Sequence, residues 1–357
     1  MTVVLPRSRV DSLVDIGDVL EILREGFRTA APEPPALRIR TDLPGPGTAT
    51  CLLPGLLAGV PAYTVKVNAK FPDARPALRG VVCLHDLQSG ELLALLDSAA
   101  VTSWRTGLAA ALGTHLLADP GAGVLGFVGA GAQAAKTLAG LRRLRRWQRV
   151  VACDLDPTRA AALSPGGVAD VSTPGGVVDV SIPGVADVVA PAVVADALTP
   201  GVVADALAPA VVAGALTTAV VADARAVAAE ADVVVLATWS RRPLLTAGDV
   251  RSGQHLTTLG ADEPGKVELS EDLLRGARVI VDDIGLATTM GALGNAGLDA
   301  SAVAGTLGDV LRGELPAHSA AVSVYAPVGL PWQDLALSWA LYQRATRSEN
   351  TIIDLLA

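Results

Sequence analysis

The sequence is poor in aromatic residues, and this shortage excludes one class of partner. Phe, Trp and Tyr make up only 3% of the 357 residues, too few for the base-stacking surfaces of proteins that bind single-stranded nucleic acid. The formal net charge of -8 would also repel a phosphate backbone. We therefore expect no nucleic-acid partner.

Cysteine is scarce as well, and long apolar runs are absent. Cys51, Cys83 and Cys153 lie far apart without the spacing of metal ligands, which is typical of free thiols in a reducing compartment. The N-terminus MTVVLPRSRV lacks the pattern of a signal peptide, and no uncharged apolar run approaches the roughly 20 residues that span a bilayer. These features predict a cytoplasmic protein with no metal site and no membrane contact.

The most unusual feature is a nonapeptide repeat. PAVVADALT PGVVADALA PAVVAGALT TAVVADARA runs from Pro191 to Ala226, and weaker copies extend back to Pro165. Proline at the start of most copies rules out one continuous helix, whereas strand-turn units and short helical units both remain open. Calcium-binding nonapeptide rolls share the recurring aspartate but need further glycines that are absent here. We interpret residues 165–217 as an insertion, which a fold tolerates because loop-closure entropy grows slowly with length.

A dinucleotide-binding pattern precedes the repeat. VLGFVGAGAQA places an apolar strand, Val124 to Val128, before a glycine turn and a helix. Gly129 permits the tight turn, Gly131 lets a pyrophosphate approach the backbone, and the amides at Ala132 and Gln133 open the helix toward the anion. We expect these four residues to contact the cofactor.

Asp154 indicates which dinucleotide is bound. It ends the next apolar run, RVVACDLD, about 20 residues after the glycine turn, where a carboxylate accepts ribose hydroxyls and repels a 2′-phosphate. The predicted cofactor is NAD.

Three more apolar runs come after the repeat, at 231–238, 254–260 and 277–283, as expected of parallel strands buried on both faces. They complete a Rossmann-type doubly wound α/β domain, and the last repeat copy is interpreted as its native third strand and helix. Thr238 and Gly260 end two of these strands, at the carboxyl edge where ligands bind, and are predicted cofactor contacts.

Cations and one carboxylate are the candidates for substrate chemistry. Arg38, Lys66 and Arg105 lie in apolar contexts that leave a charge in need of an anion, so we expect them to bind a substrate carboxylate, although each could instead pair with a structural carboxylate. Asp262 comes directly after the strand ending at Gly260 and is a candidate general base for a substrate ammonium, or alternatively a helix cap.

These motifs together resemble the ornithine cyclodeaminase/mu-crystallin family. The resemblance covers nearly the whole chain outside the repeat and rests on five stretches: KVNAKFP, LHDLQSGELLALLDSAAVTSWRTGLAAALGTHLLA, GFVGAGAQA with CDLDP, GQHLTTLGADEPGKVEL, and VGLPWQDLALSWALYQRA. It implies that Lys66 and Asp262 are catalytic residues, that Thr106 contacts the cofactor, and that Val328 and Gly329 lie near the nicotinamide.

The resemblance also implies an architecture. The substrate-binding and dimerisation domain, of α+β class, is built from residues 1–119 and 310–357, and the NAD domain, residues 120–309, is inserted between them. A homodimer acting on a small amino acid is implied.

Conversion of L-ornithine to L-proline and ammonia, by hydride transfer from and back to Cα, is the activity that the resemblance implies first. Cys51 stands near a position where similar cyclodeaminases carry an acid, and Thr289-Met290-Gly291-Ala292 replaces their Glu-Gly-Glu stretch. The stretch ALRGVVC, which contains Arg79, resembles the branch of the family that makes 2,3-diaminopropionate. An amino-acid dehydrogenase, a ketimine reductase, a non-catalytic NAD(P)H-binding protein of the mu-crystallin type and an interaction scaffold built on the repeat therefore stay open as alternatives.

Overall fold

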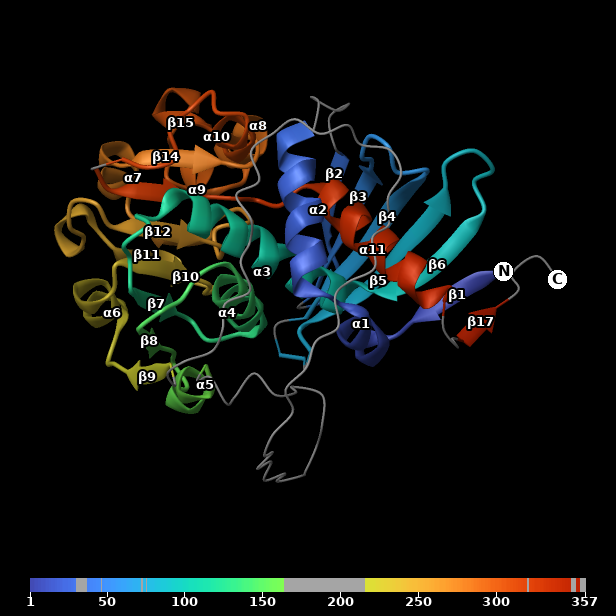
Figure 1. Cartoon of the computed structure of the whole chain (residues 1–357), viewed down its shortest axis with the longest axis horizontal. Helices are drawn as coiled ribbons and strands as arrows, with labels where there is room; N and C mark the ends of the chain where they lie inside the picture. Colours follow the sequence, from blue (N-terminus) through green and yellow to red (C-terminus); the bar gives the residue numbers. More distant parts are fainter. Residues whose placement is uncertain are drawn as a thin grey trace, which may run out of the picture.

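The computed structural model describes residues 1–29, 37–45, 47–71, 73–74, 76–163, 216–319, 321–347 and 351–353. The chain forms two lobes, each built on its own sheet, with helix α3 (Ser98–Leu117) between them (Figure 1). The repeat insertion expected at about 165–217 lies outside the described residues except for its last two.

The first lobe contains a seven-stranded sheet with the order β17-β1-β6-β5-β4-β3-β2. Helices α2 and α11 cross one face of this sheet (Figure 1), and their apolar sides bury residues such as Leu23, Phe27 and Leu335 against it. The strands and helices of this lobe are β1 (Thr2–Leu5), α1 (Arg7–Leu13), α2 (Ile16–Thr29), β2 (Leu37–Asp42), β3 (Thr48–Gly55), β4 (Ala62–Lys70), β5 (Leu78–Asp86), β6 (Leu92–Asp97), α11 (Pro331–Ala345) and β17 (Thr351–Ile353).

The second lobe contains an eight-stranded sheet whose pairs are all parallel, with the order β15-β14-β16-β12-β10-β7-β8-β9. This confirms the predicted doubly wound α/β class, and the apolar runs expected to be strands are β7, β8, β10, β12 and β14. Its elements are β7 (Val124–Val128), α4 (Ala132–Leu144), β8 (Arg149–Cys153), α5 (Pro157–Ala162), β9 (Thr217–Val220), α6 (Ala224–Glu230), β10 (Val233–Leu236), β12 (His255–Thr258), α7 (Glu271–Gly276), β14 (Arg278–Val281), α8 (Ile284–Thr289), α9 (Ala292–Asn295), β15 (Val303–Thr306), α10 (Leu307–Leu311) and β16 (Ser323–Tyr325). A two-stranded sheet, β11 (Arg241–Leu245) with β13 (Val267–Leu269), and the 3-10 helices Ala247–Asp249 and Ala300–Ala302 lie beside it.

The chain returns to the first lobe later than expected. The expected boundary is residue 310, but β16 (Ser323–Tyr325) still belongs to the eight-stranded sheet, where it pairs with β14 on one side and β12 on the other. Only α11 and β17 then join the first lobe. The third strand and helix expected at the end of the repeat are β9 and α6, and β9 pairs in parallel with β8.

Close contact between α3 and α4 joins the two lobes. An added Cβ on Gly140 would lie 2.6 Å from the Cβ of Ala111, and one on Gly107 would lie 2.5 Å from the Cβ of Lys136. Both glycines therefore allow the two helix backbones to approach more closely than larger residues would. Helix α3 is apolar around most of its surface and largely buried, yet within the described residues no helix is both long and apolar enough to cross a membrane.

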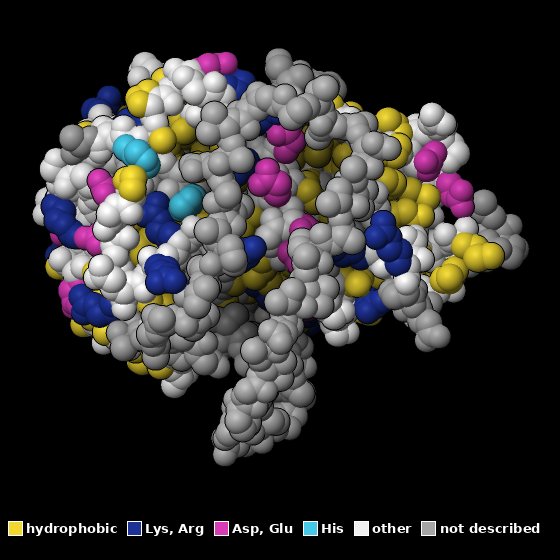
Figure 2. Space-filling view, viewed as in Figure 1, with side chains coloured by type: hydrophobic (Ala, Val, Ile, Leu, Met, Phe, Trp, Pro, Cys, Tyr) yellow, Lys and Arg dark blue, Asp and Glu magenta, His cyan; other side chains and the backbone are white. Residues whose placement is uncertain are grey.

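Charged side chains of both signs are intermixed on the face of the molecule shown in Figure 2. Lys and Arg side chains (dark blue) alternate there with Asp and Glu side chains (magenta). The described part of this face therefore offers no extended patch of a single sign.

A buried polar chain connects α3 with the second sheet. The hydroxyls of Thr114 and Thr257 are 2.7 Å apart, and the His255 ring lies 3.1 Å from the Thr257 hydroxyl and 2.8 Å from that of Ser323. Burial lowers the pKa of His255 to about 3. The imidazole is thus neutral in the folded protein at ordinary pH.

This burial predicts loss of stability in acid. Between the unfolded pKa of about 6.5 and the folded value, the unfolded chain binds a proton at His255 that the folded chain does not, so the free energy of unfolding falls as pH decreases. Between pH 7 and pH 4.5, we expect the wild-type protein to lose about 2 to 3 kcal/mol more than the His255→Asn variant. Urea unfolding of both proteins at the two pH values measures this difference, and equal losses would contradict the prediction.

Candidate active site

The predicted glycine turn comes directly after β7, as expected. Gly129 has a φ of +87°, and a Cβ there would lie 2.7 Å from the Ala237 carbonyl oxygen, so this position requires glycine. Helix α4 begins at Ala132 with Gly131 as its N-cap, and no described side chain caps it. A Cβ on Gly131 would have no described atom within 4 Å. The first amides of α4, including that of Gln133, can therefore receive an anion from this side.

Asp154 lies beside this turn, just after β8. Its Oδ2 accepts a hydrogen bond of 2.7 Å from the Ala130 amide, and its Oδ1 accepts one of 2.9 Å from the Asp156 amide. These bonds orient the carboxylate, whose other lone pairs can accept ribose hydroxyls. The turn, the helix terminus and this acid together fit a dinucleotide such as NAD.

A buried carboxylate that the sequence interpretation missed holds the ends of β10 and β12. Glu268 accepts hydrogen bonds from the amide and hydroxyl of Thr238, both at 2.7 Å, from the Thr258 hydroxyl at 2.7 Å and from the Gly260 amide at 2.8 Å. Burial raises the pKa of Glu268, although these four donors favour its charged form. The predicted cofactor contacts Thr238 and Gly260 thus lie side by side, held by one acid.

A second buried acid, Asp282, holds the turn before α11. It accepts hydrogen bonds from the amides of Val328, at 3.0 Å, and of Gly329, at 2.6 Å. Burial raises the pKa of Asp282, although the hydrogen bonds from these amides lower it. Gly329 has a φ of +94°, and a Cβ there would lie 2.1 Å from Nη1 of Arg105. The glycine therefore lets this turn pass directly against a predicted substrate-binding side chain.

Asp334, in the first turn of α11, joins two of the three predicted carboxylate-binding cations. Lys66 donates a 2.5 Å hydrogen bond to Asp334 Oδ2, and Arg105 Nε donates a 3.2 Å bond to Oδ1. Arg105 also donates to Gln333 Oε1 at 3.1 Å. The side chains of Lys66, Arg105 and Asp334 are 3%, 8% and 1% exposed. Two buried cations thus share this one buried carboxylate.

Asp262 lies in a second charged group, near the opening between the lobes. It accepts a 2.7 Å hydrogen bond from Lys266, which also lies 3.3 Å from Glu263. Glu263 in turn accepts a 3.0 Å bond from Lys70 at the end of β4. Burial lowers the pKa of Lys266, but the charges of Asp262 and Glu263 outweigh that effect and leave the pKa raised. The Lys70–Glu263 pair connects the two lobes directly.

No described contact assigns a role to two of the predicted site residues. Arg38 lies on β2, and its side chain is outside the described part of the structure. Thr106 comes directly after Arg105 on α3 and is half-buried. Among the described residues, no cluster of three metal-ligating side chains occurs, and all three cysteines are free thiols.

The sequence pattern of the ornithine cyclodeaminase/mu-crystallin family matches residues 1–211 and 202–349. The chain belongs to this family. Together the two matches span nearly the whole chain. The resemblance of motifs in the sequence is therefore confirmed at the level of the family.

Relatives with different activities are similar to this member of the family over most of its length. The alanine dehydrogenase of Archaeoglobus fulgidus is 26% identical over 355 residues, which cover 96% of this chain and 95% of that enzyme. The mouse ketimine reductase mu-crystallin is 26% identical over 301 residues, 82% of this chain and 79% of that protein. The solved structure of an archaeal alanine dehydrogenase dimer with bound NAD superposes with a TM-score of 0.79 at 24% identity, covering 99% of both chains. This last likeness establishes the fold.

The buried group around Asp334 predicts a large effect of one substitution. Asp334→Asn leaves Lys66 and Arg105 buried without their common anion, so we expect the free energy of unfolding to fall by about 3 to 5 kcal/mol. The matched control is Glu271→Gln, which removes an exposed pair with Arg275 and should cost less than about 1 kcal/mol. Urea unfolding measures both, and a loss at Asp334 as small as that of the control would show that the buried group does not stabilise the fold.

Proposed function

We propose that this protein is an NAD-dependent enzyme that interconverts an α-amino acid and its α-imino acid at Cα. The observation that carries the proposal is the pair of buried cations, Lys66 and Arg105, that Asp334 holds next to the Val328–Gly329 turn. A ligand carboxylate would accept charge-assisted hydrogen bonds from two such cations. A substrate α-carboxylate is the anion that this site fits.

The cofactor would be held along the carboxyl edge of the second sheet. The amides at Ala132 and Gln133 would bind its pyrophosphate, Asp154 its ribose hydroxyls, and the strand ends at Thr238 and Gly260 its nicotinamide half. When bound, NAD supplies the capacity to accept a hydride from Cα or to return one.

The protein's own residues would position the substrate and move its proton. Lys66 and Arg105 would fix the α-carboxylate, and Arg105 can donate to it because its Nη2 makes no hydrogen bond with any described residue. Asp262, partly exposed at the mouth of the site, would take a proton from the substrate ammonium. Holding Cα in one orientation removes the entropic cost of aligning the reacting atoms.

The finer prediction from the sequence, cyclisation of L-ornithine to L-proline with release of ammonia, belongs to the same chemistry. For that reaction Asp262 or Glu263 would have to hold the ammonium of the ornithine side chain, although Lys266 already contacts both carboxylates. Amino-acid dehydrogenase and ketimine reductase activities also involve an α-imino acid, and they differ in how that imine is formed or consumed. A cytoplasmic location stays a prediction from the sequence.

Turnover with a panel of substrates tests the proposal. Purified protein is given NAD+ with L-alanine, L-glutamate, L-lysine or L-ornithine, and NADH, ammonia and proline are measured over time. Formation of NADH, or of proline and ammonia without net NADH, is expected with at least one. Arg105→Met should lower kcat/KM about 10- to 100-fold, because a charged hydrogen bond to the substrate is lost, without changing NADH affinity.

The control is Arg275→Met, which removes an exposed arginine from α7 and should leave turnover unchanged. Reduction of imino acids with NADH is measured in parallel. Tight binding of NADH without turnover of any amino or imino acid would refute the enzymatic proposal.

We also infer that two copies of the chain pair through the outer face of the first sheet. Ile39 and Val67 are 49% and 45% exposed on this face, and Cys51 lies between them in cross-strand register. Exposed β-branched side chains in one row are typical of a surface that another chain covers. The solved archaeal relative is described as a dimer.

Val67→Glu tests this pairing. A charge in the middle of a covered apolar face should convert the dimer to a monomer, as measured by analytical ultracentrifugation. Val220→Glu on β9 is the matched control, because Val220 is also 45% exposed but lies on the second sheet. A monomeric wild-type protein, or dissociation by both substitutions, would contradict the inference.

A further inference from the structure

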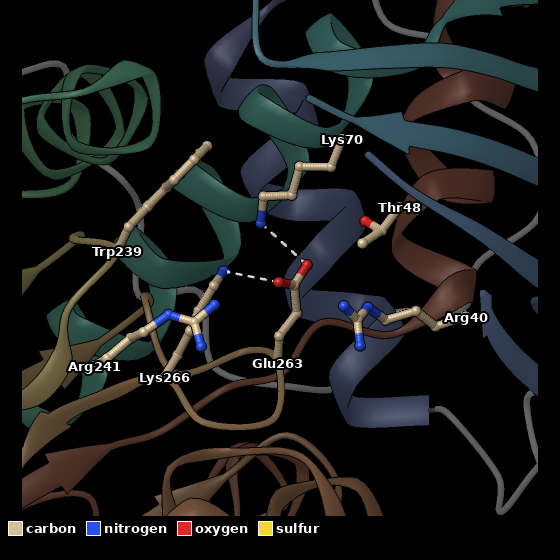
Figure 3. A pocket seen from close by; sticks show the side chains of 7 residues that line it. All are labelled: Arg40, Thr48, Lys70, Trp239, Arg241, Glu263 and Lys266. Carbon is tan, nitrogen blue, oxygen red and sulfur yellow. Dashed lines mark hydrogen bonds and ion pairs between the residues drawn. The ribbon is translucent and has the colours of Figure 1, made fainter. Parts of the chain in front are cut away.

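A cavity of about 180 Å³ opens between the two lobes. It is separate from the buried group around Asp334 but lies next to Asp262, and Figure 3 shows side chains from both lobes pointing into it. The lining residues are Arg40, Thr48 and Lys70 from the first sheet and Trp239, Arg241, Glu263 and Lys266 from the second lobe.

Two ammonium groups are held close together in this cavity. Lys70 and Lys266 both contact Glu263, at 3.0 and 3.3 Å, and both lie over the Trp239 ring, at 4.7 and 5.7 Å from its centroid. Burial lowers the pKa of Lys70, and the neighbouring charge of Lys266 lowers it further, against the effect of Asp262. A further anion here would relieve this repulsion.

The cavity carries more positive than negative charge. Four of its lining residues are cationic, and the carboxylates in contact with them are Glu263, Asp262 and Asp42. Asp42 pairs with Arg40 at 2.9 Å. Arg241 makes no ion pair with any described residue, so its guanidinium carries the positive charge that the three carboxylates do not balance. A guanidinium can donate two parallel hydrogen bonds to one carboxylate.

The cavity also lies in line with the proposed α-carboxylate site. Lys66 and Lys70 are on the same face of β4, four residues apart, which is roughly 13 Å along a strand. A substrate that reaches both positions needs a side chain longer than that of alanine. Its far end would meet Lys70, Lys266 and Arg241.

We propose that this cavity binds a second carboxylate, so that the substrate is a dicarboxylic α-amino acid or the corresponding imino acid. The inference rests on the proposed function, because it assigns the α-carboxylate to Lys66 and Arg105. It excludes a diamino acid such as L-ornithine as the best substrate, because the side-chain ammonium would meet Arg241 and two lysines.

Three amino acids of similar length and different side-chain charge test the proposal. L-Glutamate, L-glutamine and L-ornithine end in a negative, a neutral and a positive group. We expect kcat/KM to be highest for L-glutamate, by about 10-fold or more over L-glutamine, and lowest for L-ornithine. L-Aspartate and L-2-aminoadipate then measure the preferred length. A preference for L-ornithine or L-glutamine would overturn the proposal.

Arg241→Met assigns the effect to the cavity. It should lower kcat/KM about 10-fold for L-glutamate, mainly through KM, and leave L-glutamine within about 2-fold. Arg242→Met, a change at the neighbouring exposed residue, is the control and should alter neither substrate. An equal loss for both substrates in Arg241→Met would overturn the assignment.

Glutarate binding separates this inference from the proposed function. Calorimetry with glutarate and butyrate needs no turnover, and glutarate should bind at least about 10-fold more tightly, an advantage that Arg241→Met removes. If no amino acid reacts but glutarate shows this preference, the proposed function fails and the dicarboxylate site stands. If amino acids react but glutarate shows no advantage, the site is refuted and the function stands.

Discussion

The shared carboxylate of Asp334 is the interaction on which the architecture and the site both depend. It lies 268 residues from Lys66 and 229 from Arg105 in the sequence, yet contacts both in a region almost closed to water. Each of these charges is costly to bury alone. Both ends of the chain must therefore enter one lobe.

Two other buried acids hold backbone amides, and one of them also accepts hydrogen bonds from two threonine hydroxyls. Glu268 holds the ends of β10 and β12 together, and Asp282 holds the turn that leads into α11. Each accepts several short hydrogen bonds from groups that would otherwise be unpaired at the end of an element. Buried carboxylates thus fix the strand ends and the turn on this side of the second sheet.

The second sheet was largely predictable because its strands are continuous apolar runs and because the glycine turn marks where the first strand ends. The pairing of the charges was not. Glu268 lies between Val267 and Leu269, and an acid in an apolar strand is a signal of a buried partner, but the partners at Thr238 and Gly260 are evident only from the strand order. Asp334 has a similar signal in PWQDLALSWAL, since it lies on a helix that is otherwise apolar. Lys70 and Lys266 meet across the lobes, which no local pattern indicates.

The position of β16 has a consequence for how the chain is made. This strand, Ser323–Tyr325, is synthesised after β12 and β14, yet it lies inside the second sheet between them. During translation those two strands must wait for it with unpaired edges, because sheets are completed only when the long-range contacts form. The segment that completes the second sheet and the helix α11 that returns to the first lobe are only a few residues apart, which couples the folding of the two lobes.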